Sequence, residues 1–255
     1  MADAITIHHL QDLTRDETAC IAPGALAVFP TSSTEQHGPH LAVRVDARLV
    51  GEVVDHAMRH VSIARPIVLI PPLVFGASDH HRPWSGTLSL KLETYMHVVR
   101  DICESLHLNG FRRLLLINGH GGNDAPNKAA TRDVANRLDI RIESLSYWDI
   151  NREALVAVAP AVFGSLPGHA ADFETSCMLA VDPDSVRSDY RTLLDAAMAA
   201  TIDGETPGFG VAGPAAKPTL GFSDDSVHAN AELGEAFLDR AAHSLAQYID
   251  REFAG

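Results

Sequence analysis

The sequence predicts a single α/β domain, a three-layer α/β/α arrangement in which helices cover both faces of a mainly parallel sheet. Two observations lead to this fold class. Unbroken apolar runs at residues 25–29, 67–70 and 114–117 are typical of parallel strands buried on both faces. Stretches with helical periodicity follow these runs. With 255 residues the chain can bury a sizeable core, so we expect one domain over residues 1–255.

The elements are expected in the following order. Besides the three apolar runs, an alternating segment at 140–147 indicates a fourth strand. Expected helices cover about residues 11–20, 46–60, 91–107, 124–138, 151–162 and 171–180. A Gly/Pro-rich arm at about 204–221 precedes a long amphipathic C-terminal helix at about 230–253.

Composition narrows the possible partners and the compartment. The formal net charge of −13 disfavours nucleic acid and anionic membranes, since both attract cationic surfaces. The three cysteines show no CxxC spacing, so neither a disulfide framework nor a zinc ribbon is indicated. No signal peptide or membrane span is evident near the N-terminus. We expect a cytoplasmic protein.

The first motif, TEQHGPH at 34–40, directly follows the strand at 25–29. Parallel α/β sheets place their chemistry at the carboxyl ends of strands. Glu35 and His37 are two residues apart, so in extended backbone their side chains share a face. Asp46, at the start of the next helix, adds a second carboxylate, although a helix N-cap is the alternative role. Together they make half of a divalent-metal site.

Two later motifs supply more potential ligands. His120 lies in NGHGGN, a Gly-rich turn after the strand at 114–117, and His169 and Glu174 lie in GHAADFETS at 168–176. His169 is expected in the turn before the helix, from which both side chains can reach one pocket. A mixed nitrogen and oxygen ligand set without thiolate suits zinc, manganese or iron. The candidate metal ligands are Glu35, His37, Asp46, His120 and Glu174.

A long polar loop at 76–87 is interpreted as part of a substrate pocket, because loops of this length often have a function. Trp84 could form an apolar wall or pack at a subunit contact. The roles of His80 and His81 stay open. The candidate substrate-binding residues are Ser78, His81, Trp84, Gly121 and Trp148.

Taken together, STEQHGPH (33–40) with Asp46, NGHGGN (118–123) and GHA…ETS (168–176) resemble the creatininase family of metal-dependent amidohydrolases. The resemblance implies two divalent ions per chain. Glu35, Asp46 and His120 match the ligands of one ion, and His37 with the shared Asp46 match those of the other. It also implies that His169 and Glu174 are catalytic, with His169 handling substrate or protons, and that the protein forms a homohexamer.

One departure affects both the metal site and the substrate. Creatinine-hydrolysing members carry an aromatic residue and a metal-binding Glu at the positions of Gly121 and Gly122. Either Glu174 replaces that ligand, or the second ion is weakly bound or absent. The NGHGGN form is more similar to the family's formamide hydrolases and to its peptidase of a peptide-derived cofactor.

The predicted activity is hydrolysis of a C–N bond in a small amide, cyclic amide or formamide, by attack of a metal-bridging hydroxide on the carbonyl. His169 is expected to protonate the leaving nitrogen. The alternatives are a cofactor-precursor peptidase, a lactone hydrolase, a sugar-acid isomerase, or a metal-binding protein without catalysis.

Overall fold

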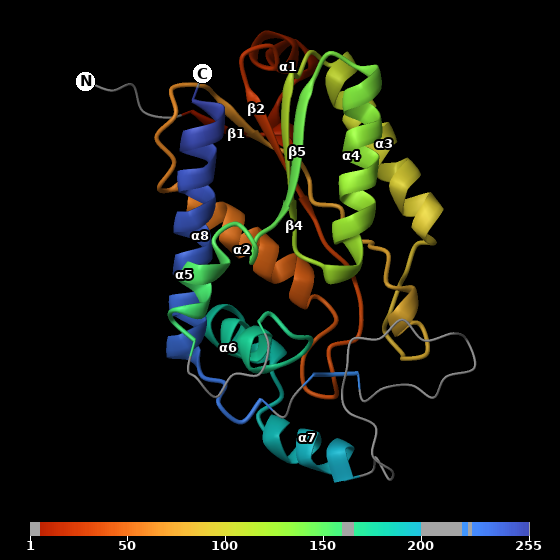
Figure 1. Ribbon diagram of the computed structural model, residues 1–255, viewed down its shortest axis with the longest axis vertical. Coiled ribbons are helices and arrows are strands. Elements are labelled where there is room, and N and C mark those ends of the chain that lie inside the picture. The colour runs from red at the N-terminus through yellow and green to blue at the C-terminus, as the bar shows by residue number, and fades with distance from the viewer. Residues whose placement is uncertain (1–5, 160–165, 200–220, 224–225, 255) are drawn as a thin grey trace.

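Five parallel strands form one sheet in the order β1-β3-β2-β4-β5 (Figure 1). The computed structural model describes residues 6–159, 166–199, 221–223 and 226–254. The strands are β1 (Ile7–His9), β2 (Leu26–Thr31), β3 (Ile67–Leu69), β4 (Arg113–Asn118) and β5 (Arg141–Ser146). The parallel sheet confirms the predicted fold class.

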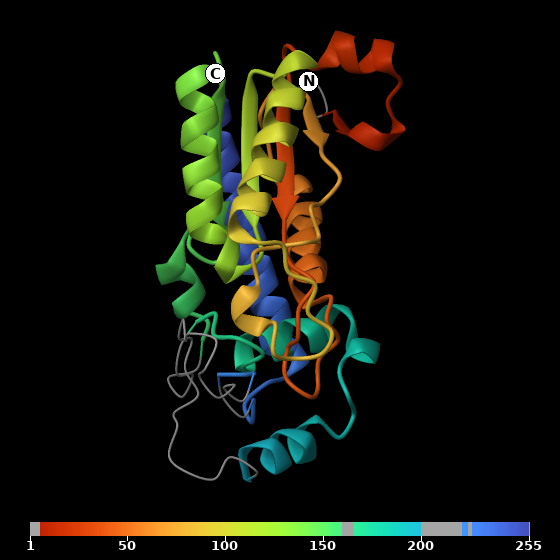
Figure 2. The same cartoon turned by 90° about the vertical axis from the view of Figure 1, so that its right-hand side faces the viewer.

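Helices cover both faces of this sheet (Figures 1 and 2). α3 (Leu92–Leu108) and α4 (Asp124–Arg137) pack together on one face, and α2 (Val45–Met58) and α8 (Ala231–Phe253) on the other. α6 (Asp172–Val181) packs against α8. The remaining described α-helices are α1 (Arg15–Ile21), α5 (Arg152–Val156) and α7 (Tyr190–Ala199). Among the described helices, none has the length and apolar composition needed to cross a membrane.

The central strands divide their side chains between two cores. Leu26 and Val28 of β2 belong to the core under α2, α6 and α8, whereas Ala27 and Phe29 belong to the core under α3 and α4. β4 alternates in the same way. Successive strand side chains point to opposite faces, so a strand covered on both sides must be apolar throughout. This explains the unbroken apolar runs in the sequence.

The topology places the first two motifs next to each other. β2 and β4 are neighbours, and their last residues, Thr31 and Asn118, are paired across the sheet. After β2 the chain continues to α2 on one face, and after β4 it continues to α4 on the opposite face. A parallel sheet opens a crevice where its connections diverge in this way. Both motifs start at that crevice.

Some elements differ from the sequence prediction. β1 and α7 were not predicted. The helix expected over 151–162 is only the five-residue α5, followed by a turn at 157–159. Apart from Gly221, the Gly/Pro-rich arm at 204–221 lies outside the described residues, as do residues 160–165. The predicted helix at the C-terminus is present as α8.

Candidate metal centre

Asp46 lies at the middle of the site, between two histidines. Its Oδ1 is 3.2 Å from His37 Nε2 and its Oδ2 is 3.1 Å from His120 Nδ1. The alternative role of Asp46 as a helix N-cap is wrong, because α2 begins at Val45 and its N-cap residue is Arg44. The Asp46 side chain, 3% exposed, instead points from the first turn of α2 into the crevice. One carboxylate therefore contacts ligands from two motifs.

Glu35 approaches the same point from the first motif. Its Oε1 is 3.3 Å from His120 Nδ1, 3.5 Å from His81 Nε2 and 3.8 Å from His169 Nδ1. Its other oxygen is buried without a hydrogen-bond partner among the described residues. A buried carboxylate oxygen without a partner is costly unless a cation or proton compensates it.

Neighbouring groups fix which ring nitrogen of each histidine faces the carboxylates. His37 Nδ1 lies 3.2 Å from the backbone carbonyl of Glu35, which directs Nε2 inward. His120 Nε2 lies 3.1 Å from Ser78 Oγ and 3.3 Å from the carbonyl of Ala77, which directs Nδ1 inward. If these outer nitrogens carry the hydrogens, the inner ones keep the lone pairs that a metal needs.

The third motif reaches the site from the start of α6. Glu174, in the first turn, accepts a hydrogen bond of 2.5 Å from the Ala170 backbone N–H, and its Oε2 lies 3.6 Å from His37 Nε2. His169 precedes the helix, as expected, and its ring lies 4.4 Å from that of His37. The two side chains thus reach one site although they are five residues apart.

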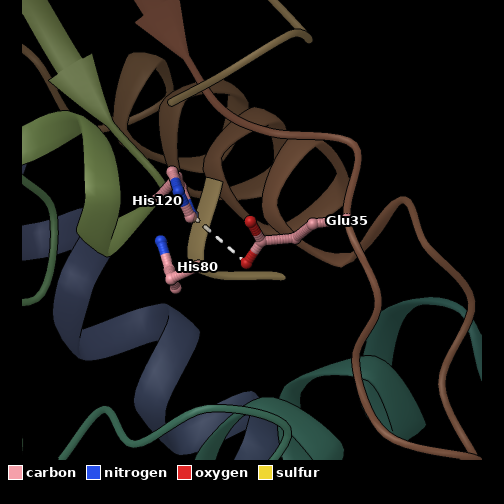
Figure 3. Close-up of side chains that lie close together, drawn as sticks. All are labelled: Glu35, His80 and His120. Atoms are coloured by element: carbon pink, nitrogen blue, oxygen red, sulfur yellow. Dashed lines mark ion pairs between the residues drawn. The ribbon is translucent and has the colours of Figure 1, made fainter. Parts of the chain in front are cut away.

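Two groups of three potential ligands result, each with its ligand atoms within 4.8 Å of one another. The first consists of Glu35, His80 and His120, which converge in Figure 3. The second consists of His37, Asp46 and Glu174, all buried. Asp46 also approaches His120 of the first group, so the two groups adjoin. Glu35, His37 and His169 form a further overlapping set.

His80 was not identified as a ligand from the sequence. Gly122 is the position that could have pointed to His80. From the sequence, it was interpreted only as the loss of a metal-binding Glu. A Cβ at Gly122 would lie 2.3 Å from the Ala77 carbonyl oxygen, 2.5 Å from His120 Nε2 and 3.0 Å from the His80 ring. No side chain fits there, because the loop that carries His80 occupies the space. The absence of a side chain at 122 and the presence of His80 are therefore linked.

The electrostatics of the site demand added positive charge. Burial lowers the pKa of His120, but Glu35 and Asp46 outweigh it and raise the pKa to about 10. For His37, burial is likewise outweighed by Glu174 and Asp46, and the pKa rises well above its usual range. Burial raises the pKa of Glu174, which keeps this carboxylate harder to ionise. Either protons on the imidazoles or divalent cations can neutralise these carboxylates, and the nitrogen and oxygen donors fit such cations.

A cavity of about 50 Å³ adjoins these groups. Three of the candidate substrate-binding residues line it: His81, Gly121 and Trp148. Ser78 is buried behind His120, which it contacts. Trp84 is absent from the described cavity lining. The structure thus supports a pocket position for three of the five candidates.

Gln36 is a neighbour of the site that the sequence did not single out. Its amide nitrogen lies 2.9 Å from His81 Nδ1 and 3.0 Å from His169 Nε2, and its Oε1 accepts from the backbone of Gly38 at 3.0 Å. This amide bridges two histidines that face Glu35. Its place between the ligands Glu35 and His37 in the motif is the only signal the sequence offered.

A family model described as creatininase, creatinine amidohydrolase, matches residues 11–249 of the chain. The chain belongs to the creatininase family. Creatinine amidohydrolase from Pseudomonas putida is 29% identical over 253 residues, covering 93% of both proteins. The mycofactocin precursor peptide peptidase of Mycobacterium ulcerans is 31% identical over 229 residues, covering 88% of this chain and 84% of the relative.

Solved creatininase structures share this fold. One described as "Creatininase Mn" aligns with a TM-score of 0.77 at 26% identity, covering 97% of this chain and 99% of the other. Another, a mutant described as "Zn-Zn type", aligns with a TM-score of 0.75 at 28% identity over 97% and 98%. This creatininase-family protein is a metal-dependent hydrolase of the amidohydrolase class. Its ligand groups agree with binding of divalent metal.

Proposed function

We propose that this amidohydrolase cleaves a C–N bond in a small amide, cyclic amide or formamide, using two divalent ions bound at the adjoining ligand groups. Glu35, His80 and His120 would hold one ion, and His37 and Glu174 the other. Asp46 would bridge them. The observation that carries the proposal is the position of Asp46, whose two oxygens contact histidines of different groups at 3.2 and 3.1 Å.

Bound divalent ions, zinc or manganese by analogy with the related structures, polarise an amide carbonyl and lower the pKa of water towards neutrality. The chain's own residues must position the amide and move protons. Trp148 and Gly121 line the cavity where the amide would lie. Glu35, Asp46 and Glu174 also line this cavity, so an amide carbonyl placed there would face the bound ions.

His169 is the proposed proton carrier. Burial, and then neighbouring His37 and His81, lower its pKa well below the usual value, so the ring is neutral near pH 7. A neutral imidazole must first accept a proton from the attacking water before it can donate one to the leaving nitrogen. This order refines the sequence-based expectation, in which His169 was only a donor.

A peptide substrate is the second candidate. Relatives described as mycofactocin precursor peptide peptidases match 88% and 89% of this chain. For a small amide and for a peptide alike, the bond broken is the C–N bond of an amide.

The test is a panel of formamides, lactams, ureido compounds and short peptides, assayed after loading with Zn²⁺ or Mn²⁺. We expect at least one class to be hydrolysed with one new amino group for each C–N bond cleaved, and losses of at least ~10³-fold in Glu35→Gln and His120→Ala, since each removes a candidate metal ligand. Acid released without amine from lactones would favour a lactone hydrolase. Full activity in both variants would refute the proposal.

A further inference from the structure

A separate cluster of potential metal ligands lies where the end of α2 meets α8. His56 belongs to the last turn of α2, and His60 follows just beyond its end. Asp239 and His243 belong to α8. Each pair has i,i+4 spacing, which places its members on one side of the helical turn. Because α2 and α8 pack against each other, the two pairs meet at the surface.

The distances bring three side chains within reach of one ion. His56 Nε2 lies 3.6 Å from Asp239 Oδ1, and the rings of His56 and His60 are 5.2 Å apart. Ligand atoms of His56, His60 and Asp239 all lie within 4.8 Å of one another. A tetrahedral ion with bonds of about 2.1 Å needs ligand atoms about 3.4 Å apart. Small rotations of these partly exposed side chains would bring the ligand atoms from their present separation to the distance that a tetrahedral ion needs.

His243 lies beside the Asp239 carboxylate. Its Nδ1 donates to the Asp239 carbonyl at 2.9 Å and lies 3.2 Å from Asp239 Oδ1. Its ring packs at 4.1 Å from that of His60. His243 therefore contacts both the carboxylate and one histidine of the cluster.

The surrounding charge favours a cation. The groove beside the cluster is lined by Glu232 and Glu235, opposed by Arg59, and by Glu52, whose charge is paired with Arg48 at 2.8 Å. The cluster is also remote from the candidate metal centre, because His56 lies ten positions after Asp46 along α2, about 15 Å along a helix axis.

We propose that His56, His60 and Asp239 bind a divalent transition-metal ion such as Zn²⁺ at the junction of α2 and α8, independently of the metal centre. Imidazole nitrogen selects zinc, copper or nickel over magnesium and calcium, which prefer oxygen. An ion at this junction would tie the C-terminal helix to the helix that carries Asp46 at its other end.

Equilibrium dialysis of the full chain against Zn²⁺ tests the proposal by stoichiometry. We expect the His56→Gln/His60→Gln variant to bind one Zn²⁺ per chain fewer than the wild type. His97→Gln, which removes an exposed histidine on α3, should bind as many ions as the wild type. Zn²⁺ should also raise the unfolding temperature of the wild type more than that of the double variant. Equal stoichiometry in the wild type and the double variant would overturn the proposal.

A second pair of variants distinguishes direct coordination of the ion by Asp239 from general electrostatic attraction to acidic side chains. Asp239→Asn should weaken binding of this Zn²⁺ by at least ~10-fold, whereas Glu235→Gln, which removes the same charge one turn away, should change it less than ~3-fold. Equal effects of the two would indicate diffuse attraction and contradict the site. Amide hydrolysis by the metal-loaded enzyme should be unchanged in all these variants, so failure here leaves the proposed function untouched.

Discussion

At the scale of single residues, the arrangement of the candidate ligands depends on neighbouring side chains that contact them. Ser78 lies behind His120, with its Oγ 3.1 Å from His120 Nε2 and 2.5 Å from Ser33 Oγ. The sequence suggested Ser78 only as a substrate contact. Its position supports a different role, in which it orients the imidazole.

Ser78→Ala should therefore weaken metal binding. Loss of a hydrogen bond to a ligating histidine typically lowers metal affinity by ~10–100-fold. Dialysis against a graded series of Zn²⁺ concentrations measures the change. Ser105→Ala, on the exposed side of α3, serves as the control. Unchanged affinity in Ser78→Ala would show that Ser78 does not position His120.

Gly122→Ala should disrupt the site, whereas Gly121→Ala should not. A Cβ at 122 would lie 2.3 Å from the Ala77 carbonyl oxygen, but a Cβ at 121 has no neighbour within 4 Å. We expect Gly122→Ala to lose ~1–3 kcal/mol of unfolding free energy, the usual cost of overpacking, and to bind less metal. Urea unfolding and metal analysis of both variants provide the test. Similar behaviour of the two would mean that the loop at 77–81 is not packed on Gly122.

At the scale of elements, the close packing of α8 on α6 places Glu174. Gly234 of α8 lies so near α6 that an added Cβ would be 2.0 Å from the Ser176 carbonyl oxygen. Ser176 is two residues beyond Glu174 on the same helix. A side chain at 234 would thus displace the element that supplies a ligand.

Gly234→Ala should destabilise the protein by ~1–3 kcal/mol and reduce its metal content. Gly51→Ala is the matched control, also within a helix but with open space around its Cβ. It should instead stabilise the protein by ~0.5–1 kcal/mol, because alanine favours helix over glycine. Urea denaturation of both variants would decide. Equal stability of the two would contradict this packing.

Periodicity and motif position were sufficient to predict most elements and the meeting of the carboxylates and histidines of the three motifs at one site. The three-residue β1 was missed because its polar sequence, IHH, lacks an apolar run and gains its place only by pairing with β3. His80 was missed because its approach to Glu35 and His120 depends on space left by Gly122, a tertiary relation. The local sequence pattern shows which residues follow the end of a strand, but it does not show which distant loop packs over them.

At the scale of the whole molecule, the pH dependence of stability reflects buried histidines beside the site. Burial is the main cause that lowers the pKa of His40 to about 4, and its Nε2 lies 2.9 Å from Thr175 Oγ1 of α6. In the unfolded chain the pKa returns to about 6.5. Below about pH 6.5 the unfolded state binds a proton that the folded state does not. The free energy of unfolding therefore decreases as the pH is lowered, until about pH 4.

This histidine should remove about 2 kcal/mol of unfolding free energy between pH 7 and pH 5, at ~1.4 kcal/mol per pKa unit. The His40→Gln variant should show a change smaller by that amount over the same interval. Urea unfolding at the two pH values measures it. An identical pH dependence in both proteins would show that His40 is not held neutral.

The homohexamer implied by the resemblance also stays a prediction, which sedimentation analysis would check.

Two metal ions shared through Asp46 are the central proposal, and its most direct test is the metal content of each chain. Elemental mass spectrometry on protein purified without chelator, and again after reconstitution with Zn²⁺ or Mn²⁺, gives this number. The His56→Gln/His60→Gln variant provides the background for counting, because it is expected to lack the separate surface ion. On that background we predict two ions per chain, and fewer than one when Asp46→Asn is added. One ion or none after reconstitution, or two ions retained in Asp46→Asn, would contradict the bridged centre.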